Sequence, residues 1–171
     1  MKKAICYLII SATFCVSSCK NETTAPEPLP GSGFIYNSKF YETPYVKLED
    51  HGEIGEDVRE TDVLFLSESL GENPSEGSKG FVVLLTLLSV NGESLLPGNY
   101  SFSDLNEAYT LSNAMIIMDY EFPATFGAVI TITDGVVNVQ ESDNGLTFKY
   151  ELTASTSKKI NGQFGIAIDL L

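Results

Sequence analysis

The sequence predicts an all-β domain, either an antiparallel β-sandwich or a flattened barrel of about 8–10 strands. The main observation is that apolar and polar residues alternate with a period of two through much of the chain after residue 33. Within residues 146–153, for example, Leu146, Phe148 and Tyr150 share one parity, and charged or hydroxyl side chains occupy the other. A second observation is that Asn-Gly and Asp-Gly dipeptides, which are typical of tight turns, separate several of these runs.

The elements follow in chain order from the same pattern. Residues 81–88 (FVVLLTLL) are apolar on both parities, which fits a buried helix or a central strand; the β-branched residues, the short length and the Asn-Gly that follows favour the strand. Residues 103–109 predict one helical turn, because Asp104 and Glu107 have capping-box spacing. Residues 68–80 predict a polar loop. The predicted strands are residues 34–37, 40–48, 62–66, 81–88, 114–120, 128–132, 146–153 and 160–170.

Four dipeptides are candidates for positive-φ positions, which glycine adopts without steric cost. Asn91-Gly92, Asp134-Gly135 and Asn144-Gly145 predict turns between strands. Asn161-Gly162 lies inside an alternating run, so it predicts either a turn or a β-bulge.

The first 18 residues have the features of an export signal. Lys2 and Lys3 precede a mostly apolar run at residues 4–16, which is shorter than the about 20 residues that span a bilayer. Val16, Ser17 and Ser18 then precede Cys19, and this arrangement resembles the lipobox of bacterial lipoproteins. The resemblance implies that residues 1–18 are removed and that the Cys19 sulfur carries a diacylglycerol. A simple cleaved signal followed by an incidental cysteine is the alternative.

Residues 19–33 predict a tether between this anchor and a single all-β domain at residues 34–171. Pro26, Pro28 and Pro30 followed by Gly-Ser-Gly suit an extended, semi-rigid spacer with a flexible end. Lys20-Asn21-Glu22 partly resembles the export signal of Bacteroidota surface lipoproteins, although Asn21 stands where that signal usually has an acid. The resemblance implies a bacterial outer membrane location, lipid-anchored, with exposure at the cell surface.

Charge and cysteine usage narrow the function classes. The formal charge of −13 becomes −15 once Lys2 and Lys3 are removed with the signal. Such a chain repels nucleic acid phosphates and anionic headgroups, so nucleic-acid binding is excluded and membrane contact is expected through the lipid. The three cysteines all lie at or before residue 19, so the domain has none left for a disulfide, a thiolate metal site or a cysteine nucleophile.

The C-terminal half resembles a group of small Bacteroidota lipoproteins with an all-β domain. The shared pattern is LPxGxY, then GxVxV, then KIxGxxG, which appear here as "LLPGNYSF", "GVVNVQESDNGLTFKYELT" and "KKINGQFG". The resemblance implies an all-β lipoprotein domain. It brings no activity and no functional residues.

Candidate chemistry is sparse. His51 is the single histidine, and without a Gly-x-Ser-x-Gly elbow we interpret it as an exposed turn residue rather than part of a catalytic triad or a zinc site. The acidic stretch at residues 49–62 is a weak Ca²⁺ candidate without an EF-hand pattern, and a solvated acidic loop is the favoured interpretation. Its candidate ligands are Glu49, Asp50, Glu53, Glu56 and Asp57.

Tyrosines and carboxylates offer two further hypotheses. Five tyrosines could form a platform for sugars, but cross-strand packing is the favoured role. These are Tyr36, Tyr41, Tyr45, Tyr109 and Tyr120. A glycosidase-like pair of carboxylates has no motif to support it.

The sequence therefore predicts a non-catalytic, lipid-anchored envelope domain that binds or adheres to an extracellular glycan or protein. No cofactor, catalytic residue or metal ligand is assigned. The first alternative is a calycin-like barrel that holds a small apolar ligand in its lumen. A weaker alternative is a carboxylate-based hydrolase.

Overall fold

The computed structural model describes residues 31–55, 57–71, 73–90, 92, 95–123, 127–143 and 145–165. The predicted signal, its recognition residues Val16, Ser17 and Ser18, the anchor Cys19 and the segment Lys20–Glu22 lie outside the described residues. So do Glu56, Asn91, Asn144 and residues 166–171. No helix in the described part of the chain is long and apolar enough to cross a membrane.

The described chain is almost entirely β-structure, as predicted from the alternation. Ten strands join into one sheet, in the order β2-β1-β10-β9-β8-β6-β7-β5-β4-β3. Every pairing is antiparallel except a short parallel contact between β6 and β7. The strands are β1 (Gly33–Tyr36), β2 (Lys39–Glu42), β3 (Tyr45–Gly55), β4 (Val58–Leu66), β5 (Lys79–Val90), β6 (Gly98–Phe102), β7 (Thr110–Glu121), β8 (Ala128–Ser142), β9 (Gly145–Ala154) and β10 (Lys159–Phe164). A single 3₁₀ turn, η1 (Glu68–Leu70), interrupts them among the described residues.

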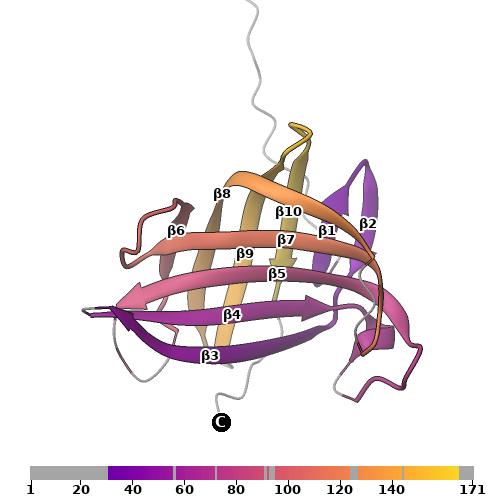
Figure 1. Ribbon diagram of the computed structural model, residues 1–171, viewed down its shortest axis with the longest axis horizontal. Helices are drawn as coiled ribbons and strands as arrows, with labels where there is room; N and C mark the ends of the chain where they lie inside the picture. The colour runs from indigo at the N-terminus through magenta and orange to yellow at the C-terminus, as the bar shows by residue number, and fades with distance from the viewer. Residues whose placement is uncertain are drawn as a thin grey trace, which may run out of the picture.

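The sheet curls into two facing layers because β8 belongs to both. Its first residues pair with β7, and its later residues pair with β6 and β9. A register shift between Ile132 and Asp134 separates the two halves, and such a bulge bends a strand. In Figure 1, β3, β4, β5 and β7 run across the front, and β9 and β10 run roughly crosswise behind them.

The space between the layers is filled by large side chains. The ring of Phe65 on β4 lies 5.4 Å from Phe148, 5.6 Å from Tyr150 and 5.4 Å from Phe164, centroid to centroid. All four residues are almost fully buried. The inner face of the front layer therefore packs on the back layer as in a sandwich, with aromatic rings where a barrel lumen would lie.

The LPxGxY pattern has a structural explanation. The Tyr100 hydroxyl donates a hydrogen bond to the Leu96 carbonyl oxygen at 2.6 Å, which closes the turn before β6. A Cβ at Gly98 would lie 2.5 Å from a ring carbon of Tyr109, whose ring packs 5.5 Å from that of Tyr100. The motif therefore serves to pack a turn against neighbouring strands, which is why it carries no chemistry.

Several sequence predictions are wrong in detail. Residues 40–48 are not one strand: Thr43 and Pro44 separate β2 from β3, which lie at opposite ends of the sheet order. Residues 103–109 form turns and bends rather than a helical turn, and the predicted loop at 68–80 instead contains η1. Asp134-Gly135 is not a hairpin turn, because β8 continues through it.

The Asn161-Gly162 dipeptide is neither a turn nor a bulge. Both residues keep regular register in β10, opposite Glu151 and Tyr150. A Cβ at Gly162 would lie 2.0 Å from Cζ of Tyr150, so the glycine is required by the close approach of that ring. Ser142 of β8 lies opposite Gly145 of β9, so the chain reverses between these two residues, where a turn was predicted; Asn144 itself lies outside the described residues.

Candidate functional site

The outer face of the front layer carries apolar side chains in addition to those that its inner face buries in the core. Side chains alternate along β4, so that Phe65 points inward and Leu64 and Leu66 point outward. Strand pairing then places outward residues in rows across the sheet. One row is Tyr45, Leu66, Val82, Ile117 and Val129, and the next is Lys47, Leu64, Leu84, Met115 and Thr131.

The β3, β4 and β5 members of these rows, together with Ile117 on β7, line a groove of about 720 Å³. Leu64, Leu84 and Ile117 are among its floor residues, and Tyr120 and Phe122 come from the end of β7 and the residue after it. Side chains on both faces of β5 are apolar. Those on one face pack in the core, and those on the other face line the groove. The strand predicted as central is therefore the strand that builds the site.

The segment that contains η1, from Ser67 to Gly71, closes one end of the groove. Leu70 is buried, and Gly71 packs so closely on Tyr45 that a Cβ there would lie 2.9 Å from the tyrosine ring. The segment is fixed to β5 because the Ser67 hydroxyl accepts a hydrogen bond from the Phe81 amide at 3.2 Å. These contacts hold the groove wall in place without a ligand.

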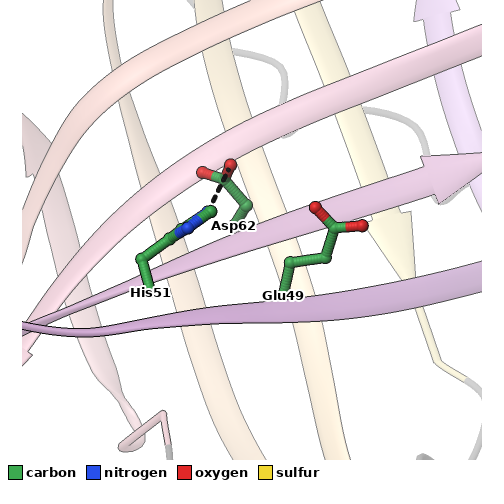
Figure 2. A group of neighbouring side chains, drawn as sticks. All are labelled: Glu49, His51 and Asp62. Atoms are coloured by element: carbon green, nitrogen blue, oxygen red, sulfur yellow. Dashed lines mark hydrogen bonds and ion pairs between the residues drawn. The ribbon is translucent and has the colours of Figure 1, made fainter.

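A polar cluster lies beyond the apolar rows, in the third row of the same face. Glu49 on β3 is directly opposite Asp62 on β4, and Thr86 on β5 follows in the row. A register shift between Asp50 and Gly52 inserts one extra residue, His51, next to this pair. Figure 2 shows the His51 ring directed at Asp62, with the Glu49 carboxylate to one side.

The cluster is held by short polar contacts. His51 Nε2 and Asp62 Oδ2 are 3.0 Å apart, and Thr86 Oγ1 donates a hydrogen bond to Asp62 Oδ1 at 2.6 Å. The Glu49 carboxylate accepts from Lys47 Nζ at 2.5 Å. The hydrogen bond to Asp62, followed by the nearby carboxylates of Glu60 and Glu49, raises the pKa of His51.

The structure reassigns the acidic stretch that was predicted as a loop. Residues 49–55 and 58–62 are paired strands of the β3–β4 hairpin, so their side chains alternate between faces. Of the Ca²⁺ candidates that the structure describes, which exclude Glu56, only Glu49 joins a group of converging donors. Asp50 instead pairs with Arg59 and the Gly52 amide, which lower its pKa, and Asp57 lies in the turn of the hairpin.

Within the described residues, Glu49, His51 and Asp62 are the group whose donor atoms converge, all within 4.8 Å of one another. Sequence reasoning missed the role of Asp62 and treated His51 as a turn residue. The sequence offered one signal, the spacing of these residues. Glu49 and His51 lie on the first strand of a hairpin, and Asp62 lies on the strand that returns beside it. Only the strand register and the bulge show that the three side chains share a face.

The five tyrosines do not form one platform. Tyr41 packs between Phe34 and Phe81, at 5.0 and 5.3 Å between centroids, which is the predicted cross-strand role. The Tyr36 ring lies 5.6 Å from Lys158 Nζ, and Tyr109 packs on Tyr100. Two of the set, Tyr45 and Tyr120, line the groove.

The fold and site therefore define an all-β domain with a packed interior and an apolar groove on its outer sheet face. No protein-family model, curated protein or solved structure matches this chain.

Proposed function

We propose that the protein is a lipid-anchored, non-catalytic binding domain of the bacterial outer membrane that takes a small apolar ligand in its outer groove. The observation that carries the proposal is the groove itself, which lies on the far side of a sheet whose inner face is already covered. Its volume of about 720 Å³ falls within the about 300–1,000 Å³ typical of ligand pockets.

The chemistry of the groove favours an apolar ligand over a sugar. Its floor is made of leucine, valine and isoleucine side chains from β4, β5 and β7. Transfer of a ligand's apolar surface onto them contributes about 25 cal/mol per Å² before the costs of immobilisation. The hydroxyls of Tyr45 and Tyr120 and the charges of Lys47 and Glu49 supply polar groups at the rim.

The anchor in this proposal comes from the N-terminal pattern. Cys19 follows a short apolar run, and the proline-rich segment after it can hold the domain away from the membrane. A ligand groove on a tethered domain suits capture of a molecule at the membrane surface.

The polar cluster gives no support to an enzyme. A carboxylate pair acting on a glycoside needs one protonated member. Here Asp62 is bonded through both oxygens, to Thr86 and His51, and Glu49 is paired with Lys47, so both carboxylates are already engaged by protein partners. The hydroxyl of Thr86 bonds Asp62 rather than His51, so the three do not form a nucleophile–base chain.

A second candidate function is contact with an extracellular protein or glycan. The observation that favours it is the open position of the groove on a sheet face, with Tyr45 and Tyr120 at its edge. Tyrosine rings with a polar tip are enriched at recognition surfaces.

The test uses the neutral fluorescent dye N-phenyl-1-naphthylamine, titrated into the purified protein. We expect saturable fluorescence enhancement that Ile117→Lys weakens by at least ~10-fold, equivalent to about 1.4 kcal/mol, because a charge then stands in the groove. Val136→Lys is the matched control, since Val136 is an exposed valine on β8 that does not line the groove. Equal weakening by both variants, or no saturable binding, would reject the groove as the ligand site.

A further inference from the structure

We propose that Glu49, His51 and Asp62 form a binding site for a divalent transition-metal ion of the Zn²⁺ class. The set offers one imidazole nitrogen and two carboxylate oxygens, a combination that suits Zn²⁺ and similar ions. The imidazole gives this set a different metal preference from a cluster of carboxylates alone, because Ca²⁺ and Mg²⁺ prefer all-oxygen ligands. The inference stands independently of the ligand proposed for the groove.

The donor atoms are close to the separation that such an ion requires. Metal–ligand bonds of about 2.0–2.2 Å in a tetrahedral site place neighbouring donors about 3.4 Å apart. His51 Nε2 and Asp62 Oδ2 are already 3.0 Å apart, and every donor of the group lies within 4.8 Å of the others. Figure 2 shows the Glu49 side chain beside the other two, and its carboxylate must leave Lys47 and turn toward them to complete the set.

The backbone holds the three positions without the metal. Glu49 and Asp62 are directly opposed in the β3–β4 ladder, and the bulge after Asp50 brings His51 to their face. The hydrogen bond from Thr86 occupies Oδ1 of Asp62 and leaves Oδ2 directed at His51. Polar partners that orient a ligand in this way are typical of metal sites.

The contacts that an ion would replace are weak. The Lys47–Glu49 pair is exposed, with 62% and 40% of the two side chains accessible, so it contributes little stability. The contact between His51 Nε2 and Asp62 Oδ2 is also replaced, because an ion held by both atoms lies between them. Three protein ligands leave at least one coordination position open for water or another ligand.

The experiment is calorimetric titration of the full mature protein, purified in detergent, with ZnCl₂, and a parallel titration with CoCl₂ followed by visible absorption. We expect one equivalent to bind, with Co²⁺ bands that indicate nitrogen and oxygen ligation. His51→Ala and Asp62→Asn should each weaken Zn²⁺ binding by at least ~10-fold, the loss seen even for residues that only orient a ligand. Thermal melts of the apo variants check that the exposed substitutions leave the fold intact.

Asp50→Asn is the matched control, because Asp50 is the neighbouring acid on the same hairpin but pairs with Arg59. It should leave Zn²⁺ affinity within about twofold of the parent. Zn²⁺ binding that survives His51→Ala, equal weakening by Asp50→Asn, or no saturable binding would each overturn the proposal. Ile117→Lys should weaken dye binding by at least ~10-fold and retain Zn²⁺ binding, which distinguishes failure of this site from failure of the groove.

Discussion

The substitution Gly162→Ala adds a single carbon atom, Cβ, to the interior and so tests how tightly the interior is packed there. A Cβ at this position would lie 2.0 Å from Cζ, 2.1 Å from Cε2 and 2.4 Å from the hydroxyl oxygen of Tyr150. Carbon atoms in contact are normally about 3.5–4.0 Å apart, so the ring would have to move by about 1.5 Å. It cannot move freely, because it stacks on Phe65, which in turn contacts Phe148 and Phe164.

Two effects of this substitution oppose each other. Replacing glycine by alanine lowers the entropy of the unfolded chain and favours folding by about 0.4–1 kcal/mol. Overpacking a filled core costs about 1–3 kcal/mol, and the depth of this overlap places the cost at the upper end. We therefore expect a net loss of about 2 kcal/mol or more in the free energy of unfolding.

The assay is urea denaturation followed by circular dichroism, with Gly165→Ala as control. A Cβ at Gly165 meets no atom within 4 Å, so that variant should be neutral or slightly more stable. In a Tyr150→Leu background, Gly162→Ala should cost much less, because the atoms it strikes are gone. If Gly162→Ala lies within about 0.5 kcal/mol of the parent, or costs as much in the Tyr150→Leu background, the reasoning is wrong.

Three further predictions follow from the same interior and from the N-terminus. Tyr150→Phe should stabilise the protein by about 1 kcal/mol in the urea assay, because the Tyr150 hydroxyl is buried with no hydrogen-bond partner among the described residues; a loss of stability would show that the hydroxyl is bonded. Burial raises the pKa of both Tyr100 and Tyr150 above the ordinary value of about 10. Since the unfolded chain ionises first, their contribution to stability is complete below pH about 10 and falls as the pH rises above it. Tyrosinate absorbance should therefore show these two phenols ionising only together with loss of the circular dichroism signal, and smooth ionisation of all tyrosines in a native protein would contradict this. Cys19→Ala should move the protein from the membrane fraction to the soluble fraction and abolish labelling with radioactive palmitate; a variant that stays with membranes would show that Cys19 is not the anchor.

The class of fold could be predicted from the sequence because alternation is a local signal. In residues 146–152, for example, the alternation predicts which side chains face inward. Leu146, Phe148 and Leu152 are buried, as predicted. The strand predicted from residues 81–88 is also confirmed, as the middle of β5. The existence of most strands therefore followed from the chain alone, but β6 (Gly98–Phe102) was not predicted.

The remaining features depend on contacts between distant segments. Asp134-Gly135 has the composition of a turn, but β9 pairs along the whole of this stretch and holds it in strand conformation. Gly162 is explained by a ring 12 positions earlier in the chain. The polar cluster was hidden because a one-residue bulge decides which face His51 occupies, and no local pattern specifies a bulge there.

The long strand β3 is the last strand of the sheet, so one row of its backbone groups has no neighbouring strand within the described sheet. Free strand edges invite pairing with another molecule, and tethering to a surface raises the frequency with which copies meet. Two register shifts, after Asp50 and after Glu53, bend this edge away from a straight template, and its charged side chains repel a second copy. The irregularity that turns His51 outward therefore also makes this edge a poor template for pairing with a second copy of the chain.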